Sequence, residues 1–227
     1  MSLPWRTVQP KHRSQKPTPD RTVSVSPERL ARWLIGFEER HGKITVTPDG
    51  EQVILAAPDG ARAVITVPFP PPPVGDSPLD DLVHHVAVGR KVGALLVRKG
   101  GYAVGVFDSR ELIRSKVGSS YVQGRTKAGG WSQQRFARRR ENQASGAYQS
   151  AADAAVSVLL PAVDDLETIV LGGNRTGVEA VLSDSRLSPV RAKASSHVLP
   201  VAEPRLPVLR AFPGQFLAVR IRLNDLA

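Results

Sequence analysis

One short segment combines the residue types that a catalyst working on RNA would need. Residues 124–142 read GRTKAGGWSQQRFARRREN, with Gly129 and Gly130 paired between two runs of basic side chains. Paired glycines allow a loop backbone to approach a ligand closely. Ser132 is a candidate N-cap, so the amide groups and the positive end of the following helix would point toward whatever the loop reaches. The segment therefore predicts a glycine loop that opens a helix.

The helix that follows this loop is rich in arginine. Arg135, Arg138 and Arg139 lie at spacings that share one helical face. A guanidinium group pairs with phosphate through two parallel hydrogen bonds, and an aromatic ring at the loop tip can stack on a base. The candidate RNA-binding residues are Arg125, Lys127, Trp131, Arg135, Arg138, Arg139 and Arg140.

The net charge is concentrated in two places. The chain of 227 residues has 31 Lys and Arg against 21 Asp and Glu, a formal charge of +10. Residues 110–141 hold nine basic residues against Glu111 and Glu141, and residues 1–22 hold five against Asp20, while the remainder is close to neutral. A concentrated basic segment indicates a polyanionic partner, most often nucleic acid; the alternative is a solvated charged face.

Several classes of site are excluded or disfavoured by composition. The chain has no cysteine, which excludes disulfides, iron–sulfur clusters and thiolate zinc sites. Asp81 and His85 have metal-ligand spacing but lack a third ligand nearby, and the glycine loop lacks the Gly-Lys-Ser/Thr ending of a P-loop. No apolar run approaches the ~18 residues of a membrane helix. We expect no metal, no cofactor, no membrane contact, a cytoplasmic location and a monomer.

The chain divides by composition into four parts. Residues 1–22 are polar, basic and without hydrophobic period, which predicts a disordered arm. A helix from Ser26 to His41 and three short strands over residues 43–67 predict a small α+β unit at 23–67. The proline-rich stretch 68–75 reads as a linker, and residues 76–227 read as a second, larger domain.

The larger domain has the pattern of a mixed sheet. We expect a helix at 76–88, strands at 92–98, 102–107, 111–116 and 120–126, and a long helix over 132–160. A buried strand at 168–171, a turn at Gly172-Gly173 with Asn174 as helix N-cap, a helix at 176–183 and a last strand at 215–223 complete the domain. This order predicts a mixed-sheet α/β or α+β fold.

The segment from Gly129 to Arg140 resembles the catalytic loop and helix of eukaryotic and archaeal class I peptide release factors. Their pattern is Gly-Gly-Gln-Ser, two residues, then Arg-Phe-Ala-Arg and a further Arg. Here Trp131 takes the place of the family's catalytic Gln, and glutamines follow at Gln133 and Gln134. A displaced Gln is typical of the Vms-like release factors, and the resemblance is best to their actinobacterial branch. Residues 93–107 also resemble the opening hairpin of that domain.

The resemblance, which covers residues 90–227, implies an RNase H-like release-factor catalytic domain. It implies hydrolysis of the ester between a nascent peptide and tRNA, with the large ribosomal subunit, its rRNA and peptidyl-tRNA as partners, in codon-independent ribosome rescue. The implied catalytic residues are Gly129, Gly130 and a glutamine. Aligned from Lys127 with one insertion, Gln133 matches the shifted family Gln; Gln134 is the alternative, or it lies on the first helical turn facing solvent.

Two other functions remain open from the sequence. Trp131 in place of Gln is compatible with a non-catalytic ribosome- or RNA-binding factor that uses the arginine helix. A tRNA nuclease would need several carboxylates on a central strand to hold metal ions, and the opening hairpin offers only Asp108.

Overall fold

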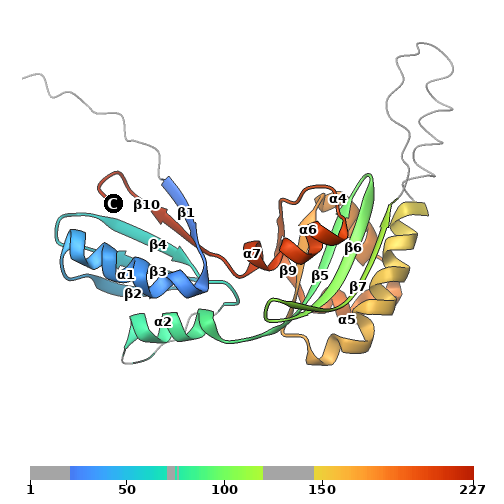
Figure 1. Ribbon diagram of the computed structural model, residues 1–227, viewed down its shortest axis with the longest axis horizontal. Helices are drawn as coiled ribbons and strands as arrows, with labels where there is room; N and C mark the ends of the chain where they lie inside the picture. Colours follow the sequence, from blue (N-terminus) through green and yellow to red (C-terminus); the bar gives the residue numbers. More distant parts are fainter. Residues whose placement is uncertain (1–20, 71–74, 76, 120–145) are drawn as a thin grey trace, which may run out of the picture.

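Two five-stranded sheets form the body of the protein. The computed structural model describes residues 21–70, 75, 77–119 and 146–227, and the two sheets lie side by side along its long axis (Figure 1). The arm at 1–20, most of the linker, the strand expected at 120–126 and every candidate site residue between 125 and 140 lie outside the described residues.

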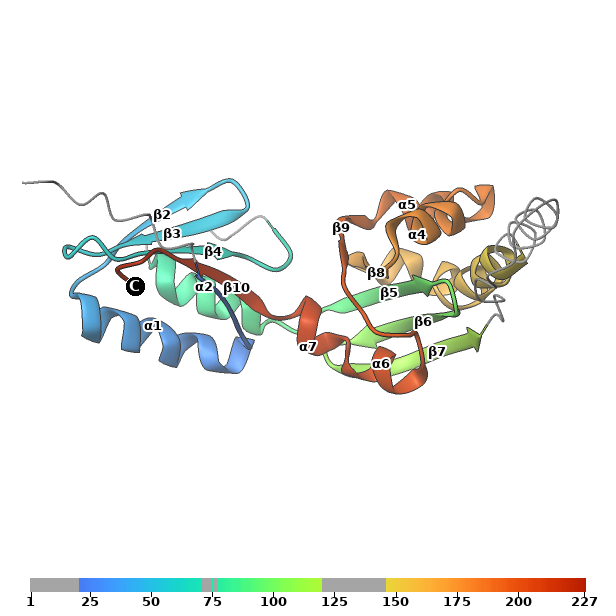
Figure 2. The same cartoon turned by 90° about the horizontal axis from the view of Figure 1, so that it is seen from above.

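The first sheet is antiparallel throughout, in the order β1-β10-β4-β3-β2. Its strands are β1 (Arg21–Val25), β2 (Thr45–Asp49), β3 (Gln52–Ala56), β4 (Arg62–Thr66) and β10 (Val219–Leu223). Two helices, α1 (Pro27–His41) and α2 (Pro78–Ala87), lie on one side of it (Figure 2). They pack on this sheet through a shared apolar core.

Helix α1 forms where its end signals predict it. Ser26 has extended backbone angles before the helix, Pro27 takes the first turn, and Gly42 ends it with a φ of 85°. Leu30, Leu34 and Phe37 recur at helical spacing and are all buried against the sheet. The expected helix and the three strands that follow it are therefore present.

The last strand is in a different place from the one predicted. The sequence pattern assigns residues 215–223 to the second domain, but Val219–Leu223 pairs with β1 and β4 in the first sheet. Val219, Ile221 and Leu223 face the helices, and the alternating arginines face out. Alternation identifies a half-buried strand but not the sheet it joins. Gln215 and Phe216, expected as the start of this strand, belong instead to the short helix α7 (Pro213–Phe216).

Helix α2 also packs with the first sheet. Leu82 and Val86 share the core of α1 and β10, whereas the sequence division places this helix in the second domain. The predicted domain boundary lies at the proline run before α2. In the structure, the first sheet and the helices on it are built from elements that precede that run and from elements that follow it.

The second sheet is mixed, with the order β7-β6-β5-β8-β9. β5, β6 and β7 are antiparallel neighbours, and β5, β8 and β9 run parallel. The strands are β5 (Lys91–Arg98), β6 (Gly101–Asp108), β7 (Glu111–Ser119), β8 (Thr168–Gly173) and β9 (Ala194–Leu199). The predicted mixed α+β fold is confirmed, although β7 continues to Ser119 where the sequence predicts its end at residue 116.

Helical segments cover both faces of the second sheet. One face carries the helix over residues 146–158 and the segments η1 (Leu160–Asp165), α4 (Arg175–Leu182), η2 (Ser185–Leu187) and α5 (Ser188–Ala192). The other carries α6 (Leu206–Ala211) and α7. Leu95 and Val97 of β5 point toward the face covered by the helix over 146–158, and Ala94 and Leu96 point toward the face covered by α6 and α7. The sheet is thus the buried middle layer of three.

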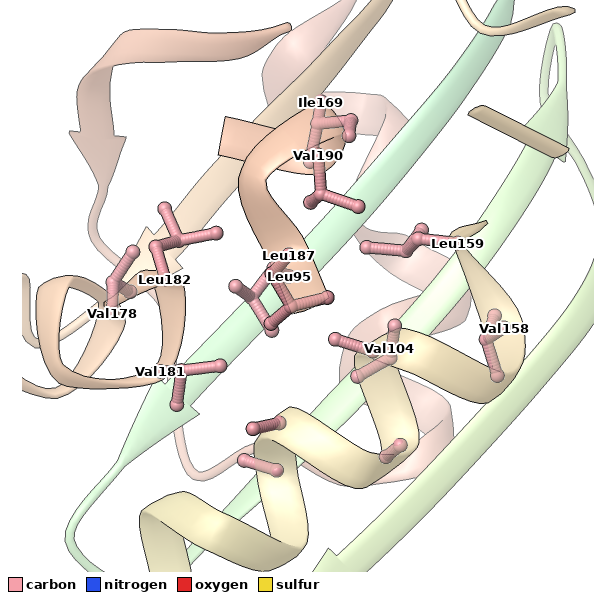
Figure 3. Close-up of a cluster of buried hydrophobic side chains, with 14 of the residues drawn as sticks. Leu95, Val104, Val158, Leu159, Ile169, Val178, Val181, Leu182, Leu187 and Val190 are labelled. Carbon is pink, nitrogen blue, oxygen red and sulfur yellow. The ribbon is translucent and has the colours of Figure 1, made fainter. Parts of the chain in front are cut away.

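The helix over 146–158 is held on the sheet by small and branched apolar side chains. Ala151 and Ala155 are fully buried, which lets the helix approach the strands closely. Val158 and Leu159 gather with Leu95 and Val104 in the same cluster (Figure 3). Within the described residues, no helix is both long and apolar enough to span a membrane.

Candidate functional site

The two attachment points of the candidate segment lie at one end of the second sheet. Ser119 ends β7 opposite Gly101, the first residue of β6. On the other side of the segment, the described part of the following helix begins at Gly146. Both points lie at the end where the β5–β6 hairpin turns and where β8 passes into α4 (Figure 1). We call this the distal end, because the first sheet lies beyond the opposite end.

Two tyrosines fix these attachment points against the sheet. A Cβ built on Gly118 would come within 2.5 Å of Tyr102 Cζ, so the ring of Tyr102 lies directly over the end of β7. At the other attachment point, Tyr148 Cε1 would lie 3.2 Å from a Cβ on Gly177, in the first turn of α4. Glycine at 118 and 177 therefore allows an aromatic ring to pack at each attachment point of the segment.

The corner between β8 and α4 is built from Gly173 and Asn174. Gly173 has a φ of 103°, which L side chains rarely adopt, and its added Cβ would lie 2.1 Å from Val97 O. Asn174 Oδ1 accepts a hydrogen bond of 2.9 Å from Gly177 N and caps the helix. The N-cap predicted for Asn174 is confirmed.

Gly173→Ala should destabilise the protein because it combines an unfavourable φ with contact against a backbone carbonyl. We expect the free energy of unfolding to fall by about 1–3 kcal/mol, as measured by urea unfolding. Gly36→Ala is the matched control: nothing lies within 4 Å of its added Cβ in α1, and we expect a gain of about 0.5–1 kcal/mol. Equal stability of Gly173→Ala and wild type would contradict the corner described here.

A cleft of about 490 Å³ opens beside this corner. Arg98, Lys99, Asn174 and Glu203 supply its polar side chains. Arg98 Nη1 donates to Val201 O at 2.8 Å, and Glu203 Oε1 is buried without a hydrogen-bond partner in the described part of the chain. No sequence motif marks Glu203, because it lies in a loop and comes to line the cleft only through the tertiary fold.

Charge is distributed unevenly along the second sheet. The described cations toward the distal end are Arg98, Lys99, Lys116 and Arg175. Several carboxylates gather at the opposite end, where Arg90 pairs with Glu167, and Lys91 Nζ lies 3.9 Å from Asp165. The segment 120–145 thus joins the body of the protein at its more basic end, which suits approach to an anionic partner.

An ion-pair network braces the helix that follows the candidate segment. Arg186 Nη2 lies 2.7 Å from Asp153 Oδ1 on that helix and 2.7 Å from Asp184 Oδ2, the N-cap of η2. The hydrogen bond from the Arg186 side chain, and then that from its backbone amide, lower the pKa of Asp184 to about 2. The same guanidinium lowers the pKa of Asp153.

Arg186→Gln should raise the pKa of Asp184 toward its ordinary value. Because the folded pKa is depressed, the contribution of this carboxylate to stability is present above pH 3.8 and is lost as the pH falls toward 2. We therefore expect acid unfolding of the variant to begin at a higher pH, with Asp184 followed by carboxyl NMR titration. Arg191→Gln removes the same charge from α5 and should leave Asp184 unchanged; an unshifted Asp184 in Arg186→Gln would contradict the network.

The other sequence candidates have structural roles. His85 Nε2 lies 3.0 Å from Phe69 O and 3.3 Å from Pro68 O, so His85 ties α2 to the preceding turn. Within the ranges that the structure describes, no group of three or more His, Asp or Glu residues is placed to hold a metal ion. Asp164, Asp165 and Glu167 lie at the end of the second sheet opposite the candidate segment.

Comparison with known proteins identifies a family over the second half of the chain. Residues 90–222 match the family model described as acVLRF1, the Actinobacteria/chloroflexi VLRF1 release factor. That range contains all the candidate residues between Arg125 and Arg140. No curated protein matches the chain.

Two solved structures are among those similar to this chain. The crystal structure of the archaeal translation termination factor aRF1 is 12% identical, with a TM-score of 0.42 over 88% of this chain and 68% of that chain. S. cerevisiae Dom34, a translation termination-like factor involved in RNA quality control, is 10% identical, with a TM-score of 0.35 over 86% and 64%.

Proposed function

Since the chain belongs to the Actinobacteria/chloroflexi VLRF1 release factor family, we propose that it is a codon-independent peptidyl-tRNA hydrolase. Its substrate would be the ester that joins a nascent peptide to tRNA on stalled ribosomes or free large subunits. The observation that carries the proposal is the family match across residues 90–222, which includes the Gly129-Gly130 loop and both candidate glutamines. The ribosome, its rRNA and peptidyl-tRNA are the proposed partners.

The chemistry requires a small, uncharged group at the end of a basic segment. Water attacks the ester carbonyl carbon and the bond to the ribose oxygen breaks. That oxygen takes one proton of the water and the other passes to solvent, leaving a free peptide carboxylate and intact tRNA. A glutamine amide can orient the water through its oxygen and donate from its nitrogen to the developing oxyanion. Gln133 is our candidate for this role, with Gln134 as the alternative.

The surrounding residues would hold the loop against RNA. Arg125, Lys127, Arg135, Arg138, Arg139 and Arg140 would contact phosphates, and Trp131 would stack on a base. The cations at the distal end of the second sheet support this proposal, because they give the neighbouring surface the same sign of charge. Restraint at both ends by Tyr102 and Tyr148 would help to position the loop for attack.

Release of a labelled nascent chain tests the proposal. Purified protein is added to stalled ribosome–peptidyl-tRNA complexes and to split large subunits, and the tRNA is analysed in the same reaction. We expect free peptide and full-length tRNA, with no dependence on divalent metal beyond what the ribosome needs. A cut within the tRNA that EDTA abolishes would instead identify a nuclease, and binding without release would contradict hydrolysis.

Trp131 favours a second candidate function. It stands where class I release factors have their catalytic glutamine, which would suit a non-catalytic factor that binds ribosomal RNA through the arginine helix. Both candidates predict weaker RNA binding after Arg135→Gln and Arg138→Gln. Only the hydrolase predicts loss of peptide release after replacement of a glutamine.

A further inference from the structure

The first sheet has one face that no described helix covers. α1 and α2 share the core on the opposite face (Figure 2). The strand register places three rows of side chains across the uncovered face. Ser24, Arg220, Thr66 and Gln52 form one row, Thr22, Arg222, Val64 and Ile54 the next, and Asn224, Arg62 and Ala56 the third.

This uncovered face is basic at its centre. Arg220 and Arg222 are exposed on β10, two residues apart and therefore about 7 Å apart along the strand. Arg62 is exposed on β4, next to Asn224 in the third row. Among the described strand positions of this face, the one carboxylate is Asp49, and it lies on the outermost strand, β2. Three guanidinium groups thus occupy the middle of an open sheet.

Hydroxyl groups surround the arginines. Thr22 and Ser24 flank β10 on one side, and Thr66 flanks it on the other; all three are exposed. Arginine together with serine and threonine is the set of side chains that proteins use to contact phosphate and sugar in nucleic acids. An open face with these groups in register fits an extended sugar–phosphate backbone better than a single small anion.

The sequence that leads into this face has the same sign of charge. Residues 1–20, directly before β1, contain Arg6, Lys11, Arg13 and Lys16 against Asp20. The opposite surface differs, because the exposed face of α1 mixes Arg29 and Arg32 with Glu38 and Glu39. Positive charge therefore predominates on the uncovered sheet face and is balanced on the helical side.

We propose that the uncovered face of the first sheet is a second RNA-binding surface, with Arg62, Arg220 and Arg222 as phosphate contacts. The inference does not rest on peptide hydrolysis, and it concerns residues remote in sequence from the candidate loop. In the proposed complex this face holds single-stranded RNA backbone along β10.

A neighbouring cleft limits where the RNA backbone can run. The cleft, of about 430 Å³, lies between the sheets and includes Thr66 and Arg220 from the first and Ser195, Ser196 and His197 from β9. Glu51 and Glu167 also line it. Two carboxylates disfavour phosphate inside the cleft, so the phosphates stay on the open face, along Arg220 and Arg222 of β10 and beside Arg62 of β4.

The test compares two double variants of the full chain that lose the same charge. Arg62→Gln with Arg220→Gln changes the open face, and Arg29→Gln with Arg32→Gln changes exposed arginines on α1. Binding of a fluorescent single-stranded RNA of about 20 nucleotides is measured by anisotropy between about 50 and 200 mM KCl. Thermal unfolding of each variant verifies that the fold is retained.

We expect the open-face variant to bind RNA roughly tenfold more weakly at low salt, and the slope of log K against log salt to fall by about 1.4, as for two lost phosphate contacts. The α1 variant should change neither quantity appreciably. In parallel, 4-thiouridine cross-linking of wild type should label peptides from β4 and β10. Equal binding by the open-face variant and wild type, or equal losses in both variants, would overturn the proposal.

Two further measurements distinguish RNA binding on this face from lipid binding and from peptide hydrolysis. If the open-face variant loses binding to phosphatidylglycerol vesicles but keeps RNA binding, the face recognises a lipid surface and the proposal is wrong. Gln133→Ala should leave RNA affinity and cross-links unchanged, because it removes no charge. If wild type releases no peptide but binds RNA through the open face, the result would contradict the proposed hydrolysis and leave the proposed RNA-binding surface standing.

Discussion

Gln133→Ala should reduce the rate of peptide release by about 10²–10³-fold, which is the usual cost of removing one donor to a developing oxyanion. The substitution removes an amide but no charge, so affinity for the ribosome should stay close to that of wild type. Single-turnover release from stalled complexes at saturating protein measures the chemical step separately from binding.

Gln134→Ala is the matched control, since it removes the same amide from the adjacent position. If Gln133 orients the water, Gln134→Ala should release peptide within a few-fold of wild type. The reverse result would assign the role to Gln134, the alternative alignment. Full activity of both single variants and of the double variant would contradict a glutamine mechanism for this protein.

Ile221→Ala should cost about 2–5 kcal/mol of unfolding free energy, the range for removing most of a buried branched side chain. Ile221 is fully buried on β10, between Val23 of β1 and Ile65 of β4 in the strand register. Its side chain belongs to the core that α1 and α2 cover. Urea unfolding measures the loss, with Thr66→Ala on the exposed face as a control expected within about 0.5 kcal/mol.

Hydrogen exchange locates the effect of Ile221→Ala. Because β10 is an interior strand of the first sheet, amides of β1 and β4 should exchange faster in the variant. β5 and β6 belong to the other sheet and should keep their protection. Faster exchange in β5 and β6 alone would indicate that the strand belongs with the second sheet, as the sequence pattern predicts.

Local structure was largely predictable from sequence because its signals are short-ranged. The Ser26-Pro27 start of α1, its apolar spacing, the turn sequences between β2, β3 and β4, and the Asn174 cap all depend on residues within a few positions of one another. The mixed sheet also followed from the order of elements. For the same reason the glycine loop and arginine run could be recognised as a motif, although its residues lie outside those that the structure describes.

Long-range placement was not predictable in the same way. The pattern of residues 219–223 is equally compatible with any half-buried strand, and pairing with β1 depends on contacts across about the whole length of the chain. Glu203 lines the distal cleft together with Arg98, which was not predictable for a similar reason, since loop residues carry no periodic signal. Only the folded chain brings such residues together.

The sequence by itself determined the chemistry available to this protein: a Gly-Gly loop with two glutamines and an arginine-rich helix, inside a family of release factors. The tertiary structure alone decided where these residues are attached and which basic side chains share a surface. It attaches the loop to the more basic end of one sheet, and it inserts β10 into the other sheet, so that Arg220 and Arg222 face outward beside Arg62. The physical reason is that side-chain type and spacing are local properties, whereas burial of apolar surface selects among distant partners and thereby sets which polar faces remain exposed.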